Sequence, residues 1–448
     1  MDTQTKSRTK FRWFVLTMIF LIYMVAGADR SNIGMVVPYI KDSFELTNTD
    51  IGAMSSFFYL TYAAVQIPAG HLYSKHGTRF LYALSIFFTS VATLIMGLAN
   101  SGLQLKWARA LLGLAEGPIN IGSVSVINKW FPTQEKGIAM GLYLSSIKFA
   151  PAFVPPLCAW LIMTYGWRSV FYAFAVPGFF LTVLWYFFVR DNPRDSKFVN
   201  EAEVHYIENP VIPSVAEKKD ATDNTSTSIG GTLDRLIRTR IVEPLANNAQ
   251  ILRSWNVWAD ALGYFGLVAI TYTIMTWIPT YLVQVKQFSI IKVGLVAAAP
   301  WVGAVLGNVI GGTLSDKVFR SRRKPVMMIT AVSTIFLMYS LKYAPNDMTI
   351  LGIMLLLAGI FLNLGYSMFL AYPMGIATKD KVPFAAAIVN TAGSLGGAFG
   401  PLAVGMILDA FGWDQVFTFL AGLSLFVLLL LITMIEPIQQ KRTTAENE

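Results

Sequence analysis

Residues 13–34 read "WFVLTMIFLIYMVAGADRSNIG", a stretch that joins a long apolar run to two adjacent charges, Asp29 and Arg30. A helix needs about 20 mostly apolar residues to cross a bilayer. The run is long enough to do so, and its charges then lie at bilayer depth, where charged side chains are costly and usually functional. The stretch therefore predicts a transmembrane helix with a functional site inside it.

Similar runs recur along the whole chain. Of its 448 residues 54% are hydrophobic and only 14% are charged, which is too apolar for a water-soluble globule. The composition predicts an all-α polytopic membrane protein with twelve transmembrane helices. We expect the spans near residues 12–38, 50–72, 80–98, 102–128, 137–163, 168–190, 256–284, 291–315, 325–343, 349–376, 383–408 and 415–436.

The basic residues fit this topology. If both termini are cytoplasmic, most of the 35 Lys and Arg fall in cytoplasmic segments, as they do in membrane proteins generally. The net charge of +9 is then a consequence of topology, and no nucleic-acid partner is expected. The single cysteine, Cys158, allows no intramolecular disulfide and no thiolate metal cluster, and we expect no metal or cofactor.

The chain divides in the middle and repeats itself. A polar tract over residues 191–253 predicts a cytoplasmic linker between two six-helix bundles, residues 1–190 and 254–448, the second with a short cytoplasmic tail. "GHLYSK" at 70–75 matches "GTLSDK" at 312–317, and "GWRSVF" at 166–171 matches "GWDQVF" at 412–417. Two matches in register predict pseudo-symmetric bundles with a substrate site at the midplane between them.

These features resemble the major facilitator superfamily over the whole chain. Within it, "ADRSNIG", "YAAVQIPAG", "RALLGLAEGP", "WFPTQEKGIAMG" and "TWIPTYL" are similar to the anion:cation symporter family. Bacterial members of that family import sugar acids such as hexonates and hexuronates together with protons. The resemblance implies a monomeric protein in the bacterial cytoplasmic (inner) membrane.

The predicted helix over 102–128 carries a polar stripe. Arg109, Gly113, Glu116, Asn120 and Ser123 follow steps of three or four, so they share one face that should not contact lipid. Arg109 and Glu116 lie two turns apart and are predicted to reach toward each other across the gap at Gly113. Two interpretations stay open: a permanent structural ion pair, or a proton-binding Glu116 tuned by Arg109. The resemblance favours the second.

Adjacent residues on a helix point about 100° apart, so Asp29 and Arg30 cannot form one direct ion pair. The Arg30 guanidinium, with Ala26 and Gly34 one turn away on either side, is suited to binding a carboxylate. Asp29 has Asn32 on its face and is a second candidate proton carrier. The resemblance implies these same roles, and the alternative is that both residues only pair with neighbouring helices.

Lys148 is a third cation inside a predicted helix, at a place where relatives carry an uncharged polar residue. It either contacts a second anionic group of the substrate, or a more compact anion, or it extends toward the cytoplasmic interface. The resemblance also implies substrate contacts for Tyr62 and Asn390, and Tyr264 is a plausible binder of hydroxyls. For these three, a hydrogen bond between helices is the alternative.

Two loops resemble the cytoplasmic gate motif of the superfamily. The motif residues are Gly70 and Arg79 in the first half and Gly312 and Asp316 in the second. The first half departs from the pattern, because Ser74 stands where an acidic residue is usual.

Together these residues predict a secondary transporter that imports a small organic anion, most plainly a sugar acid, by proton symport with alternating access. A monoanion entering a negative cell interior is opposed by about 2.3 kcal/mol per 100 mV, so uptake requires a compensating proton. The alternatives are an exchanger or exporter of a smaller hydroxy acid, an aromatic acid or an organic sulfonate, and a sensor that binds without transport. No enzyme motif stands in a suitable context, so we expect no enzyme.

Overall fold

The computed structural model describes residues 8–132, 134–208, 237–378 and 380–439, without the side chain of Ser74. The chain forms two compact units. Unit 1 comprises Met1–Asp223 with Thr276–Ala298, and unit 2 comprises Asn224–Met275 with Ala299–Glu448. The predicted boundaries at residues 190 and 254 stay a prediction, and the centre of the predicted linker, 209–236, lies outside the described residues.

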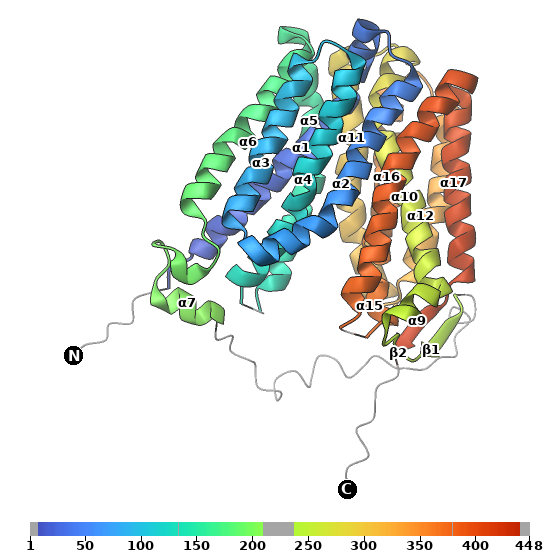
Figure 1. Cartoon of the computed structure of the whole chain (residues 1–448). Coiled ribbons are helices and arrows are strands. Elements are labelled where there is room, and N and C mark those ends of the chain that lie inside the picture. The colour runs from blue at the N-terminus through green and yellow to red at the C-terminus, as the bar shows by residue number, and fades with distance from the viewer. Residues whose placement is uncertain (1–7, 133, 209–236, 379, 440–448) are drawn as a thin grey trace, which may run out of the picture. The chain divides into compact units, whose positions relative to one another are not determined.

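Long helices follow one another at the start of the chain (Figure 1). They are α1 (Phe11–Phe44), α2 (Asn48–His76), α3 (Arg79–Leu98), α4 (Gly102–Trp130), α5 (Lys136–Tyr165) and α6 (Arg168–Phe188). A short 3-10 turn, η1 (Pro193–Asp195), and the helix α7 (Glu201–Glu208) follow. At the start of α2, Thr47 and Asp50 form a reciprocal capping box.

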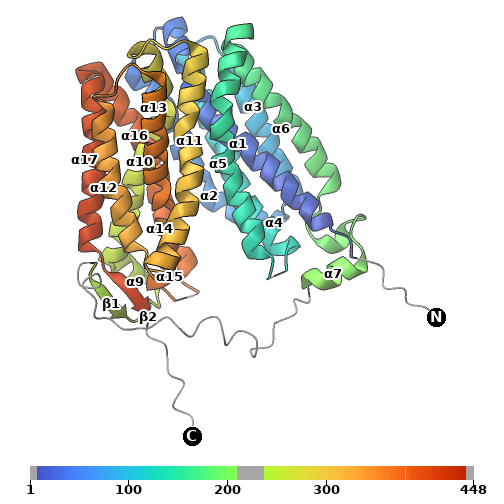
Figure 2. The ribbon, with the colours of Figure 1, turned by 180° about the vertical axis from the view of Figure 1, so that it is seen from behind.

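The second half contains shorter pieces as well as long helices (Figure 2). Its elements are β1 (Thr239–Val242), α9 (Asn248–Arg253), α10 (Trp255–Gln284), α11 (Ile290–Thr313), η2 (Leu314–Val318), α12 (Lys324–Leu341), α13 (Met348–Leu364), α14 (Tyr366–Ala371), α15 (Pro373–Ile376), α16 (Val382–Phe411), α17 (Trp413–Thr433) and β2 (Glu436–Gln439).

The predicted membrane-spanning helices are present, with two differences. Among the described residues, eleven segments are long and apolar enough to cross a membrane. The twelfth predicted span is α2, which is long but richer in Ser, Thr, Tyr and Gln. The span predicted over 349–376 is broken into α13, α14 and α15, because Gly365 turns its N–H to Thr330 Oγ1 at 2.7 Å and Pro373 supplies no backbone donor. The fold class of an all-α polytopic protein is confirmed.

The internal repeat has a structural counterpart at two glycines. Gly166 directly precedes the "WRSVF" segment and has φ +81°, and Gly412 precedes "WDQVF" with φ +77°. These values lie in the region that L side chains rarely adopt. Each glycine therefore lets the chain turn into the last long helix of its half, α6 or α17.

A second correspondence lies after those helices. Asp191 follows α6, and its Oδ1 accepts hydrogen bonds from the backbone N–H of Thr78 and, at 2.8 Å, from that of Arg79 at the start of α3. Glu436 follows α17 and accepts from the N–H of Arg323 at 3.0 Å and of Lys324 at 2.7 Å at the start of α12. The first backbone donors of a helix have no partner within it, so the acids satisfy them.

A short parallel strand pair was not predicted. β1 pairs with β2 from Thr239 opposite Glu436 to Val242 opposite Gln439. Lys324 holds both strands where they begin: its fully buried ammonium donates to the carbonyls of Ile237 at 2.9 Å and Met434 at 2.6 Å. The described end of the linker is therefore fixed to unit 2.

The other described end of the linker is fixed to unit 1. Glu203 of α7 is fully buried and accepts from the backbone N–H of Phe11 at 3.1 Å and of Arg12 at 3.2 Å, and from the Arg12 guanidinium at 2.8 Å. Arg12 also pairs with Glu135, before α5, at 2.8 Å. The short helix α7 thus caps the start of α1.

Replacing either capping acid should destabilise the protein. Asp191→Ala and Glu436→Ala each leave two backbone N–H groups without an acceptor, which costs about 1–3 kcal/mol per buried group. Thermal unfolding of the purified variants in detergent should show lower midpoints than the parent. Glu201→Ala, at an exposed position of α7, is the control and should leave the midpoint unchanged. A midpoint equal to that of the parent in both capping variants would contradict the assignment.

Candidate substrate and proton site

The centre of unit 1 contains an ion pair between two helices. Arg30 of α1 donates through Nε to Glu116 Oε1 of α4, its Nη2 forms an ion pair with the same oxygen, and the two side chains are 6% and 0% exposed. Charges removed from water in this way persist only when each has a partner. The pair therefore fixes α1 against α4 and places a carboxylate directly on the guanidinium.

Aromatic rings surround the guanidinium. The Arg30 Cζ atom lies 4.9 Å from the ring centroid of Tyr62, 5.8 Å from that of Phe58 and 5.9 Å from that of Tyr23. Aromatic faces attract a cation at such distances. Tyr62, a predicted substrate contact, is thus brought to Arg30, the predicted anion binder.

Asp29 and Arg109 lie beside this pair. Both are buried, and Arg109 donates to the backbone carbonyl of Asp29 at 3.2 Å. Asn32 donates to Asp29 Oδ1 at 3.3 Å, on the face that the sequence indicates. Asp29 Oδ2 and Glu116 Oε2 have no hydrogen-bond partner among the described residues. Each acid therefore has an oxygen on which a proton can reside.

The direct ion-pair partner of Glu116 among the described residues is Arg30 rather than the predicted Arg109. Glu116 pairs with Arg30, while Arg109 turns to Asp29 and lies 4.9 Å from the Phe58 ring centroid. The gap at Gly113 is not open: a Cβ there would lie 2.2 Å from both the Phe58 carbonyl oxygen and Thr61 Oγ1 of α2. The backbone of α2 fills the space that the two side chains of α4 would need.

The rest of the polar stripe on α4 is buried as predicted. Ser123 is 0% exposed and exchanges a 2.7 Å hydrogen bond with Tyr82 of α3. Asn120 is half-buried and accepts from the hydroxyl of Tyr143 of α5. The polar face of α4 therefore contacts other helices.

Two predicted binders belong to unit 2. Tyr264 of α10 is buried, and its ring packs against Tyr366 with centroids 5.4 Å apart. Gly393 of α16 makes room for it, since a Cβ there would lie 2.4 Å from Tyr264 Cε1. Asn390, one turn before Gly393, is exposed. The two residues thus lie on helices that are in contact, and their substrate roles stay predictions.

The gate-motif residues make contacts within their own halves. Arg79 donates to the Tyr186 carbonyl of α6 at 3.0 Å, and Asp316 pairs with Arg323 at 2.9 Å, joining the end of α11 to the start of α12. A Cβ at Gly70 or Gly312 would meet no atom within 4 Å. The side chain of Ser74 lies outside the described residues.

One buried acid was missed by the sequence reasoning. Asp260 of α10 is 0% exposed, and neither carboxyl oxygen has a hydrogen-bond partner among the described residues. It lies one turn before Tyr264. The available signal was its position as an acid inside the predicted span 256–284, where an ionisable residue indicates function.

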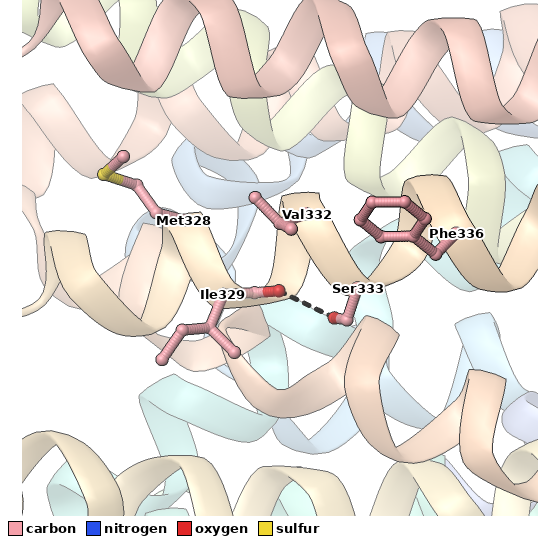
Figure 3. Close-up of a pocket in the computed structure, with 5 residues that line it drawn as sticks. All are labelled: Met328, Ile329, Val332, Ser333 and Phe336. Atoms are coloured by element: carbon pink, nitrogen blue, oxygen red, sulfur yellow. Dashed lines mark hydrogen bonds between the residues drawn. The ribbon is translucent and has the colours of Figure 1, made fainter.

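A groove on α12 offers no such chemistry. It is lined by Met328, Ile329, Val332, Ser333 and Phe336 (Figure 3). Its one polar side chain, Ser333, donates to the Ile329 carbonyl at 2.7 Å. An apolar groove of this kind suits lipid chains better than an anion.

Comparison with known proteins supports a transport function. The family model of the Major Facilitator Superfamily matches residues 19–354 and 287–448. The chain is 29% identical to the probable galactarate/D-glucarate transporter GarP of Escherichia coli strain K12, over 96% of each chain. It is 26% identical to the D-galactonate transporter of Escherichia coli O6:H1, also over 96% of each. The relatives confirm the predicted similarity to sugar-acid transporters.

A solved structure shows the same fold. A bacterial homolog of the human lysosomal transporter Spinster, in an inward-facing and unoccupied conformation, aligns with a TM-score of 0.74 at 17% identity, covering 94% of this chain and 96% of that one. The family match extends over more than half of the chain and the matched relatives are transporters, not enzymes. The chain is therefore a multi-pass membrane transporter and belongs to the Major Facilitator Superfamily.

Proposed function

We propose that this transporter imports a sugar-acid anion together with protons. The observation that carries the proposal is the buried pair of Arg30 and Glu116. A planar guanidinium surrounded by aromatic rings is a suitable receptor for a substrate carboxylate. Relatives named as transporters of galactarate, D-glucarate and D-galactonate support a sugar acid as the ligand.

The pair also supplies a coupling mechanism. Glu116 occupies donor groups of Arg30 that a substrate carboxylate would use, so the two carboxylates compete. Protonation neutralises Glu116, weakens its hold on Arg30 and frees the guanidinium for the substrate. Proton binding at Glu116 and anion binding at Arg30 therefore promote each other, and the same coupling free energy acts in both directions.

Asp29 is the second proton carrier in this proposal. It is buried, its backbone carbonyl accepts from Arg109, and its carboxyl accepts from Asn32 and has one oxygen without a described partner. With one or two protons bound, an anion enters a negative interior without the full electrical penalty of about 2.3 kcal/mol per charge per 100 mV. The two halves then exchange access to the site by rigid-body rocking, with both termini in the cytoplasm of a bacterial inner membrane.

Glu116→Gln should separate exchange from coupling. The amide has the shape of the protonated acid but cannot release a proton, so substrate exchange should persist while pH-gradient-driven accumulation falls at least about tenfold. Both activities would be measured with the purified variant in liposomes, using radiolabelled galactonate and galactarate.

Glu201→Gln on α7 is the matched control and should accumulate substrate like the parent. Full gradient-driven accumulation by Glu116→Gln would remove Glu116 from the coupling mechanism. Parent protein that exchanges but never accumulates substrate would instead indicate an exchanger.

Arg30→Lys should weaken substrate binding although the charge is kept. An ammonium lacks the planar fork that holds a carboxylate by two parallel hydrogen bonds, so the apparent affinity should fall at least about tenfold, or 1.4 kcal/mol. Isothermal titration of the detergent-purified protein measures this loss. Arg253→Lys, at an exposed position of α9, should bind like the parent. Equal affinities for all three proteins would rule out Arg30 as the receptor.

A further inference from the structure

Lys148 of α5 takes no part in the coupling mechanism above, although it lies inside a membrane-spanning helix. It is twelve residues beyond Lys136, where α5 begins, or about 18 Å along the axis. The hydrocarbon core is about 30 Å thick, so this depth is near its middle and beyond the reach of a lysine from the interface. The interpretation that Lys148 extends to the cytoplasmic surface is therefore disfavoured.

The packing of α1 on α5 gives the depth of Lys148 relative to Arg30. The rings of Tyr23 and Tyr143 have centroids 4.6 Å apart, and four residues further along both helices a Cβ on Gly27 would lie 3.3 Å from the Ile147 carbonyl oxygen. The two helices thus run in parallel with a constant offset. Lys148 is level with Ala28, only two residues or about 3 Å below Arg30 along the axis.

The direction of Lys148 follows from its neighbours on α5. Pro155 and Ala159, seven and eleven residues further on, share its face, and both touch Gly294 of α11 within unit 1. The large aromatic residues on the exposed outer face of α5 form a different stripe, Phe149, Phe153 and Trp160. Lys148 itself is half-buried. Its side chain therefore leaves the helix on the face that carries Pro155 and Ala159 and away from that aromatic stripe.

The charges away from the ends of α1, α4 and α5 set a constraint on the substrate. Arg30, Arg109 and Lys148 carry three positive charges, and Asp29 and Glu116 two negative ones, which leaves one positive charge when the site is empty. If both acids are protonated, all three positive charges remain. A substrate with two negative charges then returns the net charge of the site to the single positive charge of the empty site. Transport of this substrate with two protons moves no net charge across the membrane.

Resting on the proposed function, we infer that the substrate is a dianion whose two anionic groups are held by Arg30 and Lys148. Arg30 takes a carboxylate through its planar fork, and Lys148 takes the second group as a point charge with three donors. A sugar diacid satisfies this description, and so does a small carboxylate that carries a sulfonate. A sugar acid with a single carboxylate leaves Lys148 without its anionic ligand.

The inference is tested with two probes that differ at one end. Galactarate and galactonate have the same carbon chain, but galactarate has a second carboxylate where galactonate has a hydroxymethyl group. Isothermal titration of the purified full chain should show at least tenfold tighter binding of galactarate. Lys148→Gln should weaken galactarate binding at least tenfold and change galactonate binding less than twofold. Sulfoacetate is the third probe, for a substrate with a sulfonate.

Control variants separate charge from folding. Lys148→Arg keeps the positive charge and should retain most of the preference for galactarate, while Lys129→Gln, at an exposed position of α4, should behave like the parent. Thermal unfolding of each variant checks that the fold is intact.

The outcomes distinguish the two levels of the proposal. Binding of none of the three probes by the parent protein overturns the proposed function. Equal binding of galactarate and galactonate, or an equal loss of both in Lys148→Gln, overturns only the dianion inference. Sulfoacetate binding that depends on Lys148, without binding of galactarate or galactonate, overturns the sugar acid of the proposed function but supports a dianion and assigns the smaller class.

Discussion

The buried ion pair of Arg30 and Glu116 is the interaction on which the rest of unit 1 depends. Two charges at this depth are tolerated only because each satisfies the other. The helices that carry them are held at the right distance by α2, whose backbone contacts Gly113 of α4 so closely that any side chain there would collide with it. A glycine on α4 thus influences which partner Glu116, three residues or about one turn further along the same helix, will have.

The same dependence makes the pair suitable for coupling. In the proposed mechanism Glu116 already occupies the guanidinium of Arg30. A substrate carboxylate therefore binds there only by displacing the carboxylate of Glu116. In the proposed mechanism this competition needs no long communication path, because the proton site and the anion site share the guanidinium of Arg30. The aromatic rings of Tyr23, Phe58 and Tyr62 keep that guanidinium away from water, where the competition would be weak.

The fold could be predicted from the sequence because hydropathy and the distribution of basic residues act on whole segments. Contacts between residues of the same helix could also be predicted: Asn32 lies one turn from Asp29 and donates a hydrogen bond to its carboxylate. The direct partner of Glu116 could not be predicted in this way. The backbone of α2 packs against Gly113, and a pattern along α4 alone carries no information about another helix. Asp260 stood outside every motif, and the strand pair β1–β2 joins two four-residue segments about 200 residues apart.

The two capping acids, Asp191 and Glu436, limit where the length of the chain can change. Asp191 comes three residues after α6 ends, and it holds the start of α3 just as Glu436 holds the start of α12. The first residues after the sixth long helix are therefore part of the bundle rather than of the connection. Insertions, deletions or a fused reporter domain are therefore expected to be tolerated only after Asp191 in the first half and only after strand β2 in the second half. The connection between the two halves is thus free to change in length only after Asp191.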